Sequence, residues 1–231
     1  NADMTTTGTG TLDLEAGGDL AIYNGNRISA GNGHMRLQAG GSMTLGELHT
    51  SGNVALQATT ISDSGTTDTD VSAAQLMLRT TGTAANNGAG ATDNHLDIAV
   101  TTLAAEVKGT VAGGLFLSET DGITVDTVAQ IAVNRVKADG TVAGSTVNHG
   151  ALSDLNSAGH LVLATNNGAI TVNGGGDTSG ITAAGNLLLK AGEVGEGGED
   201  NADHITFNAA VTVTAGHISM DAADDIVLAT N

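Results

Sequence analysis

The sequence contains no cysteine, no proline and no tryptophan, and only three of its 231 residues are aromatic. The lack of cysteine excludes a disulfide framework and suits a large protein that crosses membranes unfolded. The lack of proline leaves every segment able to donate hydrogen bonds inside a sheet. The scarcity of aromatic side chains excludes an ordinary globular core built around large rings.

Basic residues are also scarce, with 7 Lys and Arg against 25 Asp and Glu and a formal net charge of −18. A field of this sign repels phosphate backbones and anionic lipid, so we expect no nucleic acid partner. No run of 18 apolar residues occurs, and we expect no membrane insertion. The first ten residues lack the basic and apolar parts of a signal peptide, so an export signal is expected outside this sequence.

What the chain does contain is 34 glycines and 40% hydrophobic residues. This composition is too apolar for disorder. Glycine and threonine recur every few residues, which disfavours helices, so we expect many short strands around a thin core. A solenoid has a core of this kind.

A repeat supports this interpretation. Each copy reads apolar-x-apolar, a turn of two to four small or polar residues, and a second strand, and a third short segment precedes each first strand. First strands are expected to begin near Leu12, Met35, Val54, Leu76, Leu115, Ile131, Leu161, Leu187 and Ile218. Leu96 is expected to open the second strand of the Leu76 coil. The fold class is therefore predicted as all-β, a right-handed parallel β-helix of about nine coils of three short strands.

The domain organisation is expected to be a single segment, residues 1–231, of a longer rod. Asn-Gly pairs are expected at corners that need a positive φ, at 24–25, 32–33, 87–88, 167–168 and 173–174. Three inserted loops are expected, near 81–94, 137–156 and 192–203. Solenoids place binding sites on such loops, and neutral drift at exposed corners is the alternative.

The repeat in GHMRLQAGGSMTL and GHLVLATNNGAITV resembles the haemagglutinin-type repeats of filamentous bacterial adhesins that two-partner or related type V systems secrete. The resemblance implies a rod at the surface of a Gram-negative bacterium or released from it, with an adhesive or biofilm role and no enzymatic activity. The partner would be a glycan or protein of a host or neighbouring cell, or a copy of the chain itself. The chain would be an internal stalk segment, because it lacks the Asn-Pro-containing secretion domain of that family.

Two acidic corners are the sharpest candidate site. In the expected register they stack about 5 Å apart, close enough to share a Ca²⁺ ion with six to eight oxygen ligands. A solvated acidic loop is the alternative, because no Ca²⁺-binding loop motif occurs. No cofactor is otherwise required. The candidate Ca²⁺ ligands are Glu196, Glu199, Asp200, Asp203, Asp221, Asp224 and Asp225.

Other functions are expected to fit less well. Five histidines stand immediately before an apolar strand residue, where other coils have Asn or Gln, so they are expected to be outward polar residues and not a metal ladder: His34, His95, His160, His204 and His217. The basic and aromatic residues are scattered, and no nucleophile-base pair is visible, which argues against a polysaccharide-processing enzyme. The leading hypothesis is an adhesin stalk, the first alternative is a carbohydrate-binding module of a matrix protein, and the polysaccharide-processing enzyme is the least favoured.

Overall fold

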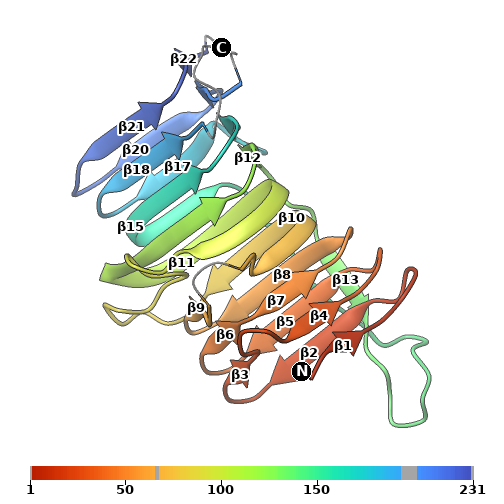
Figure 1. Ribbon diagram of the computed structural model, residues 1–231. Helices are drawn as coiled ribbons and strands as arrows, with labels where there is room; N and C mark the ends of the chain where they lie inside the picture. The colour runs from red at the N-terminus through yellow and green to blue at the C-terminus, as the bar shows by residue number, and fades with distance from the viewer. Residues whose placement is uncertain (1, 66–67, 194–201, 230–231) are drawn as a thin grey trace.

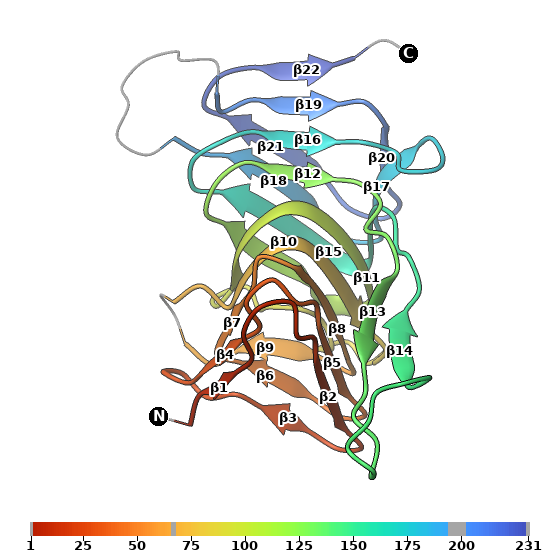
Figure 2. The ribbon, with the colours of Figure 1, turned by 90° about the vertical axis from the view of Figure 1, so that its right-hand side faces the viewer.

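Short segments with an apolar residue at every second position form strands that bury one face, and the computed structural model of the protein is all-β (Figure 1). The structure describes residues 2–65, 68–193 and 202–229, and within these ranges it has no helix. Most strands belong to one large sheet in which neighbours pair in parallel. They stack in layers from the N-terminal end of the molecule to the C-terminal end (Figures 1 and 2).

The pairings arrange the strands in three ladders. The first ladder contains β1 (Met4–Thr5), β4 (Arg27–Ser29), β7 (Glu47–His49), the first residues of β10 (Val71–Thr80) and β11 (Leu96–Glu119), β12 (Ile123–Val125), β16 (Ile170–Val172), β19 (Ile205–Phe207) and β22 (Ile226–Leu228). At β12 its register shifts, because β12 pairs with the middle of β11.

The second ladder contains β2 (Leu12–Ala16), β5 (Met35–Ala39), β8 (Asn53–Ala58), the rest of β10, the middle of β11, the start of β15 (Leu155–Thr165), β17 (Ser179–Ala183) and β20 (Ala210–Val213). The third contains β3 (Leu20–Ala21), β6 (Met43–Leu45), β9 (Ile61–Asp63), a bridge at Ala89, the ends of β11 and β15, β18 (Leu187–Ala191) and β21 (Ile218–Ala222).

The core lies between the ladders and is built from columns of apolar residues in exact register. One column of the second ladder passes through eight layers: Leu14, Leu37, Leu56, Leu78, Ala105, Leu155, Ile181 and Val211. All eight pack in one continuous hydrophobic cluster. A slip of one residue would turn every one of these side chains outward, so burial of this face fixes the register.

Three details of the sequence-based register are wrong. The expected first strands do not form one ladder: four lie in the second ladder, at Leu12, Met35, Val54 and Leu76, and four in the third, at Leu115, Leu161, Leu187 and Ile218. Ile131 does not begin a stacked strand: it belongs to β13 (Ile131–Asn134), which forms an antiparallel hairpin with β14 (Thr146–His149). The alternating pattern of IAVN is real, but it serves a two-stranded hairpin. Leu96 does not open a second strand of the Leu76 layer, because Ile98 pairs with Val71 and starts the next layer.

At three of the five Asn-Gly corners, glycine is needed for a different physical reason than the expected positive φ angle. Gly25 and Gly168 have positive φ angles of 79° and 122°. Gly33, Gly88 and Gly174 do not, but a Cβ atom at each would collide with a backbone oxygen, of Gly10 in the case of Gly33. At Gly33 and Gly88 glycine is needed because the backbone of a neighbouring layer passes very close, whereas at Gly174 the oxygen belongs to Asp177 of the same turn.

The three expected loops have different outcomes. Residues 81–94 contain no named strand, although Ala89 bridges the third ladder. Residues 137–156 include β14 and the start of β15. Of residues 192–203, only 192–193 and 202–203 lie among the described residues.

The register can be tested by disulfide formation, because the chain has no cysteine of its own. Thr44 on β6 is the register partner of Ser62 on β9, with the two hydroxyl oxygens 3.4 Å apart. We expect the T44C/S62C variant to form a disulfide under mild oxidation, because paired strands lie about 4.8 Å apart and a disulfide spans Cα atoms up to about 7 Å apart.

The matched control is A21C/S62C. Ala21 pairs with Thr44 from the other side, so its distance from Ser62 is two layers, about 9.6 Å. It should stay reduced, as judged by mass spectrometry of thiol-labelled protein. Equal oxidation of both variants would contradict the register.

Candidate functional site: a clasp on the outer face of the stack

The segment 127–153 leaves the stack after β12 and rejoins it at β15, and we call it the clasp. Figure 2 shows β13 running along the side of the stack toward the N-terminal layers and β14 running back beside it. The two ends of the clasp are joined to each other. Thr127 Oγ1 lies 2.7 Å from Ser153 Oγ, and Val128 and Leu152 exchange two main-chain hydrogen bonds of 2.8 and 3.0 Å.

The clasp covers an apolar strip on the outer face of the second ladder. Ala55, Met77 and Ala104 are in register on β8, β10 and β11 and face away from the core. Each is at most 1% exposed, because Val128, Ile131 and Leu152 of the clasp pack against them. Outward positions of a half-buried strand are normally polar, so three apolar ones in a column indicate a covered surface.

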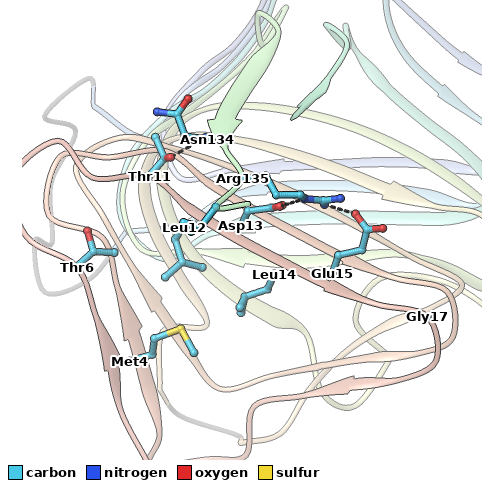
Figure 3. Close-up of a pocket in the computed structure, with 11 residues that line it drawn as sticks. Met4, Thr6, Thr11, Leu12, Asp13, Leu14, Glu15, Gly17, Asn134 and Arg135 are labelled. Atoms are coloured by element: carbon cyan, nitrogen blue, oxygen red, sulfur yellow. Dashed lines mark hydrogen bonds and ion pairs between the residues drawn. The ribbon is translucent and has the colours of Figure 1, made fainter. Parts of the chain in front are cut away.

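The same outer column ends in ionic residues on the two layers nearest the N-terminus. Arg36 Nη1 lies 2.7 Å from Asp13 Oδ1 and 3.1 Å from Glu15 Oε2. From the clasp, Arg135 Nε lies 2.7 Å from Asp13 Oδ2, and Arg135 also pairs with Glu15 (Figure 3). The Arg36 and Asp13 side chains are each only 7% exposed.

The two arginines hold both carboxylates in the ionised form. Burial alone would raise the pKa of Asp13, but the hydrogen bonds from Arg135 and Arg36 outweigh it and lower the pKa below its ordinary value. Hydrogen bonds from Arg135 and Arg36 also lower the pKa of Glu15. Neither carboxyl is therefore suited to donate a proton at neutral pH.

A groove of about 600 Å³ lies beside this network, between β1, β2 and the far end of the clasp (Figure 3). Thr11 Oγ1, at its rim, accepts a 2.9 Å hydrogen bond from the main-chain N–H of Asn134. Among its described lining residues there is no histidine, serine, lysine or aromatic ring. The groove offers ion pairs, threonine hydroxyls and apolar side chains for contact.

The predicted Ca²⁺ corner lies only partly within the described residues. Glu196, Glu199 and Asp200 lie outside them. Asp203 and Asp224 are brought together, since the Asp203 N–H donates to Asp224 Oδ2 at 3.0 Å. The carboxylate of Asp203, a residue that is 2% exposed, accepts a hydrogen bond from the N–H of Gly168.

The other two described members of this corner make separate contacts. Asp221 Oδ2 lies 3.8 Å from Lys190 Nζ, and the carbonyl of Asp225 accepts from the Ile205 N–H. The described residues contain no group of three or more His, Asp or Glu side chains arranged to hold a metal. Ca²⁺ binding through the full set of seven residues stays a prediction.

A second group of carboxyls was only partly visible in the sequence. Asp63 and Asp70 are the first and last residues of an acidic run. Asp97 of the next layer lies beside them, and its N–H donates to Asp70 Oδ2 at 2.9 Å. Asp70 is 3% exposed, and burial together with the adjacent Asp63 carboxyl raises its pKa to about 9. Glu119, 1% exposed, has its pKa raised by burial to about 8.

His34 and His160 are polar residues at corners of the stack, as predicted. Their Nδ1 atoms accept hydrogen bonds of 2.9 Å from the N–H groups of Asn53 and Asn186 in the next layer. Asn53 in turn donates to Gln75 at 3.1 Å. His34, Asn53 and Gln75 therefore follow one another at the corner before the second ladder, whereas His160, Asn186 and His217 stack at the corner before the third.

Comparison with known proteins gives no further guide to function. No protein-family model matches the chain, and neither a curated protein nor a solved structure matches it. The described residues include no helix long and apolar enough to span a membrane. The case for a function therefore depends on the geometry of this chain.

The buried ion pair leads to a first prediction for this site. We expect Asp13→Asn to lower the free energy of unfolding by about 3 kcal/mol, because it leaves the buried Arg36 guanidinium without its closest counter-charge. Glu15→Gln is the matched control and should have little effect, because the Glu15 side chain is 43% exposed. Urea unfolding measures both variants. Equal losses would show that the burial of Asp13 is unimportant.

The Asp70 carboxyl gives a pH-dependent prediction. Its folded pKa of about 9 exceeds the ordinary 3.8, so the folded state keeps a proton that the unfolded chain releases. Stability is then lost as the pH rises from 4 toward 9. Asp70→Asn removes this loss, and its advantage over wild type should grow by on the order of 1 kcal/mol per pH unit between pH 5 and pH 8. The control is Asp68→Asn, at an exposed position nearby, and an advantage that does not vary with pH would refute this interpretation of Asp70.

Proposed function

We propose that this chain is part of a right-handed parallel β-helix that serves as the stalk of a large adhesin, on or released from the surface of a Gram-negative bacterium. The observation that carries this proposal is the order of the pairings. β4 pairs with β1 and β7, β5 with β2 and β8, and β6 with β3 and β9. Each strand therefore pairs with the strand three places along the chain, as expected for a chain that winds through three faces per coil.

Two further points support the finer description. The first ladder has nine members among the described residues and the other two have eight, in agreement with about nine coils. A right-handed winding follows from the strong preference of parallel crossover connections for that hand. At about 4.8 Å per layer, the stack is about 40 Å long.

A structural role is supported by how the unusual carboxyls are used. Asp70, Glu119 and Asp154 have raised pKa values, and each is at most 7% exposed. Glu119 accepts main-chain hydrogen bonds from Val100, Thr120 and Asp121. The Glu119 carboxylate, and that of Asp70, which accepts from the Asp97 N–H, are engaged within the stack, so the proposal includes no catalytic step and requires no cofactor. A continuous interior and mutually paired layers give a stiff spacer, which a stalk needs.

A second candidate function is carbohydrate binding, favoured by a polar groove of about 480 Å³ on the outer face of the first ladder. Its described lining includes His49, Ser72 and Thr120 together with the Arg27–Glu47 ion pair, whose closest atoms are 2.6 Å apart. Hydroxyl, imidazole and charged groups can bind sugar hydroxyls, although the lining lacks an aromatic ring for stacking.

A glycan array separates the two functions. For a stalk, we expect the purified chain to bind no glycan above background, and antibodies raised against it to label intact cells of the source bacterium. Binding of a glycan that is lost in the H49A/S72A variant but kept in T212A, a change on a different face, would favour the carbohydrate-binding module. Labelling that requires permeabilised cells would rule out the surface stalk.

A further inference from the structure

The clasp contains one buried histidine, His149, and covering the apolar strip does not require a titratable side chain at this position. His149 on β14 is paired with Ile131 across the hairpin and is 8% exposed. Its Nε2 atom is buried and has no hydrogen-bond partner among the described residues. An unpartnered nitrogen in a buried imidazole costs free energy, and the cost becomes much larger if the ring is protonated, because a charge is then buried without an acceptor.

The charges that face His149 come from the clasp and from the three strands beneath it. Arg36 of β5 and Arg79 of β10 oppose a positive charge on the ring, whereas Asp13 and Glu15 of β2 favour one. Both acids are already paired with Arg36 and with Arg135 of the clasp. Arg79 also donates to the carbonyl oxygens of Gly150 and Ala151, at 3.2 and 3.1 Å, directly after His149 in the chain.

We propose that the clasp is an acid-released strap: protonation of His149 detaches the hairpin from the stack and uncovers the strip of Ala55, Met77 and Ala104, while the stack itself stays folded. A protonated imidazole would be a third cation, beside Arg36 and Arg79, in a site largely closed to water. Leaving that site returns the charge to solvent.

The direction of the pH effect follows from linkage. Burial, and then the charges of Arg36 and Arg79, lower the pKa of His149 to about 4, against an ordinary value of 6.5. The released clasp therefore binds a proton between pH 6.5 and pH 4 that the docked clasp does not, and docking weakens as the pH falls through this range. Protonation of Asp13 and Glu15, whose pKa values are lowered from the ordinary 3.8 and 4.5, weakens docking further as the pH falls below about 4.5.

Asp154, which follows the clasp in the chain, has a pKa that is raised and not lowered. Burial, with Asp177 and Asp126 nearby, raises the pKa of Asp154 to about 6. Asp154 belongs to the stack, since its carbonyl accepts from the Ala105 N–H at 2.9 Å. It keeps these neighbours whether the hairpin is docked or released, so its proton does not enter the docking equilibrium.

The geometry allows the hairpin to leave without unfolding the stack. The strip and the clasp form a small hydrophobic cluster that is separate from the interior cluster of the stack. Ala104 and Ala105 are consecutive on β11, both 0% exposed, yet the first belongs to the cluster under the clasp and the second to the interior. A thiol at Ala104 therefore reports release of the clasp, and a thiol at Ala105 reports unfolding of the stack.

The test measures how fast a buried thiol reacts in the A104C and A105C variants. The reagent is 4,4′-dithiodipyridine, which reacts with thiols at acid pH, and each rate is divided by that of free cysteine at the same pH. We expect A104C to react about twenty-fold faster at pH 5 than at pH 7, the change that linkage gives for a pKa lowered from 6.5 to about 4. A105C should stay protected at both pH values.

The role of His149 is tested by adding H149Q to A104C, because glutamine is neutral at both pH values. The twenty-fold change should fall to less than about twofold. A pH effect that persists in H149Q, or one that appears equally in A105C, would overturn the proposal. An NMR titration of the wild-type chain gives an independent reading that needs no cysteine variant: a His149 pKa near 6.5 would also overturn it.

Discussion

Main-chain hydrogen bonding between adjacent layers is the constraint on which the rest of this structure depends. Most strands have only two to six residues and could not persist alone. Each is held because its N–H and C=O groups pair with the layers on either side. This requirement explains the absence of proline, and it also explains glycine at corners such as Gly33, where the backbone of one layer passes directly over that of the next.

Stacking also determines how an acidic chain manages its charge. Residues in register lie about 4.8 Å from their counterparts in the next layer, so carboxyls near one another repel strongly. The structure has two solutions to this problem. Asp13 is ionised between Arg36 and Arg135, whereas Asp70, beside Asp63 and Asp97, holds its proton. The first depends on the clasp being docked and the second is internal to the stack.

The clasp forms ion pairs on the outer face of the stack and also connects layers that lie far apart in it. It attaches at the layer of β12 and β15 and reaches the layer of β2, so it ties together layers that are otherwise connected only through their neighbours. A stalk gains stiffness from such a tie. If His149 releases the clasp in acid, the stack keeps its hydrogen bonds but exposes an apolar surface of three side chains. Stability of the stack and exposure of the strip are then controlled separately.

The sequence by itself determined the class of structure and the inward faces of most strands. Alternation at Leu12 and Leu14, or at Leu161 and Leu163, is a local pattern of period two, and burial of one face leaves a single register. It also identified His34 and His160 as corner residues, because neighbouring copies of the repeat have Asn or Gln there.

Only the tertiary structure decided what lies on the outside. The segment at Ile131 has the same alternation as a stacked strand, and no local signal distinguishes a strand that joins a ladder from one that pairs with β14. The partnership of Arg135 with Asp13 joins residues 122 positions apart, and the covering of Met77 by Ile131 likewise links distant segments. Such contacts depend on where a long insertion returns to the stack, which a period of two residues does not encode.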